Sequence, residues 1–96
     1  MMYHILPYSY NQALKLGVKI GPSHRKNKKI DVYDWNGQYI CSIGDSRYLD
    51  YPNFAKKFGI EYANNKRRLY RLRHGKEKQK PDWIGSPSFY SWFLLW

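Results

Sequence analysis

The stretch IDVYDWNGQYICSI, residues 30–43, decides the fold. Apolar and aromatic residues stand on both sides of its Asn36-Gly37 pair: Ile30, Val32 and Tyr33 before it, and Tyr39, Ile40 and Ile43 after it. An Asn-Gly pair supplies both positive-φ positions of a type I′ turn, so the stretch predicts a β-hairpin over about 29–43. A hairpin alone is marginally stable in water, so it has to pack on helices or gain another strand.

Helices are predicted on both sides of the hairpin, at about 9–16, 51–58, 61–74 and 87–95. Residues typical of helix ends bound them: Ser9, Asp50 and Ser86 at starts, and Gly17, Gly59 and Gly75 at ends. Pro52 and Pro87 suit a first helical turn, where a missing N–H leaves no hydrogen bond unmade. The predicted fold class is therefore α+β, with the hairpin packed against these three or four short helices.

The 96 residues correspond to one small domain, 1–96, with no room for a second core. GPSHRKNKK, residues 21–29, reads as a basic turn or loop opened by the Gly21-Pro22 breaker. KEKQKPD, residues 76–82, predicts a mobile polar linker, and Gly44-Asp45-Ser46 predicts a turn after the hairpin.

The charge of the chain is strongly positive and uneven. Lys and Arg number 17 against 7 Asp and Glu, which gives a net charge of +10. Residues 1–30 hold six basic and no acidic residues, 31–55 hold four Asp and one Arg, and 56–80 hold ten basic residues and two Glu. Such clustering attracts acidic partners, nucleic acid first and a membrane surface next. A charge that only aids solubility is the alternative.

The predicted helix around 62–74 concentrates this charge. On a helical wheel its apolar residues share one broad arc: Tyr62, Ala63, Leu69, Tyr70 and Leu72. Arg67, Arg68 and Arg71 fall opposite and are predicted to project into solvent, where forked guanidinium donors match phosphate oxygens. Other cations are expected to extend this nucleic-acid-binding surface: Lys56, Lys57, Lys76, Arg25, Lys26, Lys28 and Lys29. A merely solvated face is the competing interpretation.

The remaining cations of this helix have a different predicted role. Lys66 and Arg73 fall inside the apolar arc. Each is expected to lay its stem over an aromatic ring and to pair with an aspartate of the 45–50 turn. No helix-turn-helix, zinc-finger or RNA-recognition signature accompanies the helix, so the predicted binding is largely independent of base sequence and sensitive to salt.

The C-terminal segment is almost entirely aromatic and aliphatic, with Phe89, Tyr90, Trp92, Phe93, Leu94, Leu95 and Trp96 around the whole helix. One face has to close the core, and the rest is expected to be exposed in a monomer. Trp92, Phe93 and Trp96 are therefore candidates for contact with another protein, because Trp and Phe are favoured anchors at interfaces. Core packing explains about half of these residues equally well.

Catalytic chemistry is not predicted. The histidines lack metal-ligand spacing, no glycine loop cradles a phosphate, and Cys41 sits in a predicted strand among apolar residues. Asp45 and Asp50 are weak evidence for a metal. We therefore expect no enzyme, catalytic residue, metal or cofactor. A single cysteine suits a reducing compartment, and neither a signal peptide nor a membrane span is expected.

Several segments taken in order carry a family resemblance: ALKLGVKIGPS (13–23), KKIDVYDWNGQYICSIGD (28–45), YLDYP (48–52), KRRLYRLRH (66–74), and Ser86-Pro87 followed by Tyr90 and a terminal LLW (94–96). Over residues 10–96 the chain resembles an uncharacterised family of small basic proteins from large DNA viruses, including algal and amoebal giant viruses, and from some phages. The resemblance implies a viral origin and transfers no activity. Relatives carry small and charged residues where Ser91-Trp92-Phe93 stand, so this tail is more apolar than theirs.

The sequence thus predicts a non-enzymatic viral accessory or virion-associated protein that binds nucleic acid, DNA in the first place, or an acidic viral protein. The alternative is a minor capsid or cement protein that contacts larger virion subunits through its aromatic C-terminal helix. The expected location is the virion, or the cytoplasm or nucleus of the host cell at the viral factory. The oligomeric state stays open.

Overall fold

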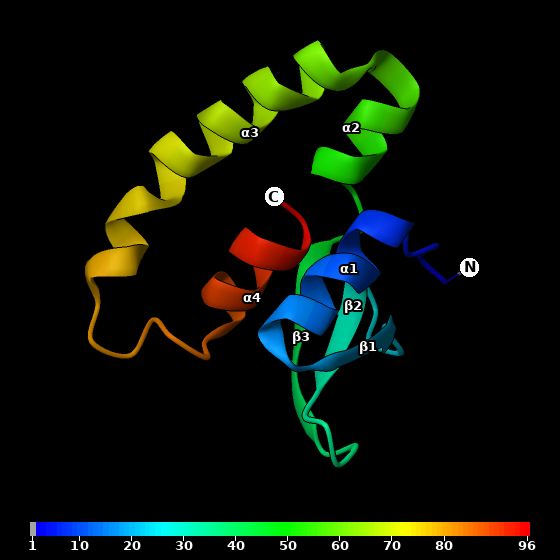
Figure 1. The fold of residues 1–96 in the computed structure, drawn as a ribbon, viewed down its shortest axis with the longest axis vertical. Helices are drawn as coiled ribbons and strands as arrows, with labels where there is room; N and C mark the ends of the chain where they lie inside the picture. Colours follow the sequence, from blue (N-terminus) through cyan, green and yellow to red (C-terminus); the bar gives the residue numbers. More distant parts are fainter. Residues whose placement is uncertain (1) are drawn as a thin grey trace.

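The structure, a computed structural model, describes residues 2–96 and has the predicted α+β architecture (Figure 1). Its elements in chain order are α1 (Pro7–Leu16), β1 (Lys19–Pro22), β2 (Lys28–Tyr33), β3 (Tyr39–Asp45), α2 (Tyr51–Phe58), α3 (Ile60–His74), the short 3-10 helix η1 (Gly75–Gln79) and α4 (Pro87–Leu94). The hairpin and all four helices are confirmed. Within residues 2–96, no helix has the length and apolar character that crossing a membrane requires.

The sheet gains a strand that the sequence did not reveal. Its antiparallel order is β1-β2-β3, with Ile30 opposite Ile43 in the hairpin and Ile20 opposite Val32 on the other side. The Gly21-Pro22 pair indicated a break, yet both residues lie in β1. A proline, which has no N–H to donate, is tolerated there because β1 is an edge strand and has a neighbouring strand on one side only. The predicted 21–29 loop is therefore shortened to the residues between β1 and β2.

The hairpin turn is not of the predicted type I′. Gly37 has a φ of 88°, whereas Asn36 does not have the positive φ that this turn requires. Asp34 organises the turn instead, since its carboxylate accepts the N–H groups of Asn36 and Gln38 at 2.9 Å each. Gly44, predicted to begin a turn, lies inside β3 with a φ of 81°. A Cβ there would stand 2.8 Å from the side chain of Leu95, so only glycine lets the chain end pack so closely.

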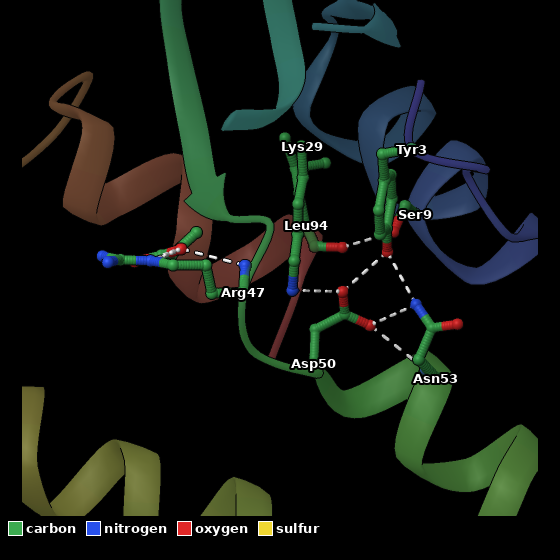
Figure 2. Close-up of polar contacts among 8 residues, drawn as sticks. Tyr3, Ser9, Lys29, Arg47, Asp50, Asn53 and Leu94 are labelled. Atoms are coloured by element: carbon green, nitrogen blue, oxygen red, sulfur yellow. Dashed lines mark hydrogen bonds and ion pairs between the residues drawn. The ribbon is translucent and has the colours of Figure 1, made fainter. Parts of the chain in front are cut away.

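The main core lies between the sheet and two helices that contact each other, α1 and α4 (Figure 1). Ile30, Val32 and Leu94 are completely buried in it. Ser9 does not cap α1, because that helix already begins at Pro7 with Leu6 at its N-cap. The buried Ser9 hydroxyl instead donates to the carbonyl of Leu94 at 2.6 Å and joins the two helices (Figure 2). We call the sheet with α1 and α4 the body.

A second, aromatic cluster holds α3 against the C-terminal segment. Tyr70 of α3 stacks on Trp96 with ring centroids 4.4 Å apart, and Trp83 and Trp92 complete the buried group. The prediction that Trp92 is free to contact another protein is wrong, because its side chain is only 8% exposed. Phe93 and Trp96 are half-buried in the same cluster. The aromatic tail therefore closes the domain's own core, as small domains rich in aromatic residues require.

Figure 1 shows α3 as a long arm that begins beside α2, passes over α4 and the C-terminus, and returns through η1. Part of the predicted 76–82 linker is thus the short helix η1. Two members of the predicted apolar arc of α3 are on the surface, since Leu72 is 68% and Tyr62 44% exposed. Only Ala63 and Tyr70 of this helix are buried. We call residues 60–80 the arm.

Candidate nucleic-acid interface

The arm carries eight cations against two carboxylates, Glu61 and Glu77. The cations are Lys66, Arg67, Arg68, Arg71, Arg73, Lys76, Lys78 and Lys80. Among residues 2–96, no carboxylate forms an ion pair with any of the eight. Glu77 is engaged by Ser88 and by His74, whose hydrogen bonds hold the pKa of that carboxyl below its ordinary value. The arm therefore keeps its positive charge.

Aromatic rings hold several of these cations in place. Distances from the charged group to the ring centroid are 3.5 Å for Arg67 over Tyr51, 4.7 Å for Lys78 over Trp92, 5.4 Å for Lys66 over Tyr62 and 5.5 Å for Arg71 over Trp92. The negative face of a ring attracts a cation but brings no net charge. These side chains are thus positioned without being neutralised, which a carboxylate partner would not allow.

Arg67 is not the outward-pointing residue that the helical wheel predicts. Its guanidinium lies flat against Tyr51 and its Nη2 contacts the Tyr8 hydroxyl at 3.4 Å. Its Nε is buried without a hydrogen-bond partner among the described residues. The reason is that α2 folds back beside α3 and covers this side of the helix. Arg67 therefore contributes first to holding the arm on α1 and α2.

Arg68 and Arg71 do reach solvent, as predicted. Arg68 donates to the side-chain oxygen of Asn65 at 3.0 Å, which leaves other guanidinium N–H groups free. Both line a shallow depression of about 450 Å³ together with Asn64, Arg67 and Leu72. Two forked cations one helical turn apart suit adjacent phosphate oxygens.

Lys29 has to be removed from the predicted surface. It is 3% exposed and pairs with Asp50, Nζ to Oδ2, at 2.9 Å (Figure 2). Tyr3 and Asn53 also donate to this carboxylate, so the buried Asp50 accepts hydrogen bonds from three residues. Burial and the adjacent Asp50 charge raise the pKa of Tyr3.

The predicted ion pairs of Lys66 and Arg73 with the 45–50 turn are wrong. Asp50 is taken by Lys29, and Asp45 by Arg47 at 2.7 Å. The expected stem-over-ring packing is confirmed for Lys66, which also lies 5.8 Å from the Phe54 ring. Arg73 is exposed. Both cations line the side of α3 opposite Arg68 and Arg71.

The loop between β1 and β2 forms a second basic surface. Arg25, Lys26 and Lys28 are exposed and line a cavity of about 640 Å³ with His24 and neighbouring residues. Asp31 anchors this loop, because it accepts from the Ser23 hydroxyl at 2.6 Å and the His24 N–H at 3.2 Å. Burial alone would raise the pKa of Asp31, but bonds from Ser23 and Ser42 lower it overall.

The remaining predicted cations are exposed at the two ends of the arm. Lys56 and Lys57 stand on the last turn of α2, next to the start of α3, and Lys76 stands in η1 at its end (Figure 1). The rings that hold the cations, Tyr51 and Trp92 above all, were not predicted, and neither was the exposed ring of Tyr48. Their pairing with cations depends on how α2 and α4 pack on α3, which no local pattern of the sequence shows.

Among residues 2–96, no three His, Cys, Asp or Glu side chains come together as a metal site would need. Burial raises the pKa of the Cys41 thiol, which disfavours the thiolate form that a nucleophile uses. No protein-family model matches the chain, and no curated protein or solved structure matches it significantly. Function therefore has to be argued from the surfaces themselves.

Proposed function

We propose that the protein binds nucleic acid, largely without regard to base sequence, as a non-enzymatic viral accessory or virion-associated protein. The observation that carries the proposal is the arm: eight cations, none paired with a carboxylate among the described residues, several of them fixed over aromatic rings. Phosphate contacts made by such groups bind tightly at low salt and weaken as salt displaces them.

Two surfaces contribute to this binding. Arg68 and Arg71 offer forked donors on the arm, and Arg25, Lys26 and Lys28 add charge on the β1–β2 loop. The viral setting is proposed from the sequence resemblance of residues 10–96 alone, and with it a location in the virion or at the viral factory. No helix-turn-helix, zinc-finger or RNA-recognition signature accompanies these surfaces in the sequence, which favours contact with the backbone.

Fluorescence anisotropy with labelled oligonucleotides, single-stranded and duplex, at about 20–200 mM salt tests the proposal. We expect binding at low salt to at least one form. The Arg68→Ala/Arg71→Ala variant should bind about tenfold more weakly, and its log–log salt slope should fall by about 1.4–1.8, since each lost phosphate contact removes about 0.7–0.9.

A matched control removes the same charge from the body. Lys15 and Lys19 are exposed at the end of α1 and the start of β1, so Lys15→Ala/Lys19→Ala should reduce affinity less than threefold, by about the effect of net charge alone. No binding at low salt to either form overturns the proposal. Equal weakening in both double variants overturns the assignment to the arm.

The capsid-cement alternative loses its main support. It depended on an exposed aromatic tail, and Trp92 is buried while Phe93 and Trp96 pack in the same cluster. Nothing else on that helix offers a large apolar surface, because Tyr90, Leu94 and Leu95 are buried in the main core. Nucleic-acid binding is therefore the better-supported function.

A further inference from the structure

A groove runs along the side of α3 that faces the body. Two cavities, of about 390 and 210 Å³, share four lining residues: Tyr48, Leu49, Arg73 and Trp96. They are therefore one continuous depression, bounded by α3 on one side and by the β3–α2 connection, residues 46–50, on the other. We call it the groove. It lies on the face of α3 opposite Arg68 and Arg71.

The groove is cationic along its length. Lys66 and Arg73 line the end beneath α3, and Lys28 lines the end near the sheet. Lys28 also lines the cavity of the β1–β2 loop together with Arg25 and Lys26, so the positive surface continues around the body. Among the described residues that line the groove, Asp45 is the only carboxylate, and Arg47 already neutralises it.

Aromatic rings alternate with these cations. The Tyr48 side chain is 67% exposed on the rim, so its ring is accessible to a ligand in the groove. Trp96 lines the floor and is held rigidly by Tyr70, with the ring planes only 7° apart. Three further rings, of Phe54, Tyr70 and His74, also line the groove. A packed floor ring and an exposed rim ring together suit a flat, unsaturated ligand group.

Building on the proposed function, we infer that the groove binds a single strand of nucleic acid, with bases stacked on Tyr48 and Trp96 and phosphates on Lys28, Lys66 and Arg73. Proteins that bind single strands combine a positive groove with rings on which successive bases stack. A duplex hides the faces of its bases and presents only their edges, so it gains nothing from these rings. The Arg68 and Arg71 surface has no such rings exposed and serves either form.

Affinity for a twelve-nucleotide oligo-dT strand and for a twelve-base-pair duplex, measured in parallel at low salt, tests this inference. We expect the wild-type protein to prefer the single strand. Tyr48→Ala should weaken single-strand binding about tenfold, because the loss of one stacked base has about that effect, and should leave duplex binding within twofold. Tyr48→Phe, which keeps the ring, should retain the wild-type preference.

Tyr10→Ala is the matched control, because Tyr10 is an exposed tyrosine on α1 that lines neither cavity of the groove. It should change neither affinity. The oligo-dT and oligo-rU strands distinguish DNA from RNA, and preference for either supports the groove. Quenching of tryptophan fluorescence by the single strand should shrink in Trp96→Phe, which preserves the stacked ring.

The results also separate this inference from the proposed function. If the wild-type protein binds both forms equally and Tyr48→Ala changes neither, the groove is not the site, although nucleic-acid binding through Arg68 and Arg71 still stands. If the protein binds neither form at low salt, both proposals fall. Equal weakening of single-strand and duplex binding by Tyr48→Ala also overturns the inference, since stacking would then not be the cause.

Discussion

The charged side chains of the body and of the arm have different kinds of partner. In the body and the segment that follows its sheet, every aspartate from 31 to 50 accepts hydrogen bonds from within the protein. Asp31 accepts from Ser23 and Ser42, Asp34 from the N–H groups of its own turn, Asp45 from Arg47, and Asp50 from Lys29. In the arm the cations meet rings instead of carboxylates. The body uses its aspartates to define its own structure, whereas the arm leaves its cations available to a partner.

This difference also appears in burial. The sheet and α1 and α4 enclose a core with several completely buried side chains, but α3 buries only Ala63 and Tyr70. A helix with so little apolar contact depends on its neighbours for stability. We therefore expect substitutions at polar residues of the body to change folding strongly, and substitutions at the arm's cations to change binding.

Asp50→Ala should produce the largest loss of stability. It leaves Lys29 buried without a counter-ion, which typically costs about 3–5 kcal/mol in the free energy of unfolding. Urea denaturation followed by tryptophan fluorescence measures the loss. Asp45→Ala, which breaks the exposed pair with Arg47, is the control and should leave the denaturation midpoint near that of the wild type. Similar midpoints for the two variants would contradict the expectation that the buried ion pair contributes more to stability than the exposed one.

Asp31→Asn should cause the next largest loss of stability, about 1–3 kcal/mol in the free energy of unfolding. It replaces one carboxylate oxygen by an NH2 group, which cannot accept hydrogen bonds from Ser23, His24 or Ser42. The carboxylate has a pKa lowered below its ordinary value of 3.8 in the folded protein. Its contribution is therefore complete above that ordinary value and is lost as the pH falls through the lower, folded-state pKa. As the pH is lowered from about 6 to about 2.5, the urea midpoint should therefore fall less in Asp31→Asn than in the wild type.

Arg67→Met and Arg68→Met test whether neighbouring arginines have separate roles. Arg67 is stacked on Tyr51, so its loss should destabilise the fold by about 1–2 kcal/mol, while the exposed Arg68 should matter by less than about 0.5 kcal/mol. Measured on the folded proteins, the loss of oligonucleotide affinity should be larger in Arg68→Met than in Arg67→Met. If Arg68→Met is the less stable of the two, the division of the arm into holding and binding residues is wrong.

Local patterns predicted much of the fold correctly. The hairpin and the four helices follow from turn and capping residues close in sequence, and α2 matches its predicted bounds of 51–58. The strand β1 was missed because it has four residues and ends in a proline, too little for an alternating pattern. Its existence depends on pairing with β2, a contact that local sequence does not encode.

The charged residues show where prediction from sequence ends. Lys29 and Asp50 are 21 positions apart, and nothing near either residue indicates that the fold buries them together. The helical wheel predicted wrongly that Arg67 projects into solvent, because a wheel does not show that Tyr51 of the preceding helix covers that side. Lys66 was given the right ring contact and the wrong carboxylate. Long-range packing decides which cations remain free.

Gly75→Ala should have the smallest effect, and in the stabilising direction. Gly75 joins α3 to η1 with φ −58° and ψ −31°, and an added Cβ would meet nothing within 4 Å. Because alanine adopts this helical conformation with less loss of chain entropy, the variant should gain about 0.4–1 kcal/mol in urea denaturation. Oligonucleotide affinity should stay unchanged if the arm binds as the preformed surface that the ring contacts imply. A variant that is more stable but binds more weakly would show that the arm has to bend at this junction to bind. The arm would then not be a preformed binding surface.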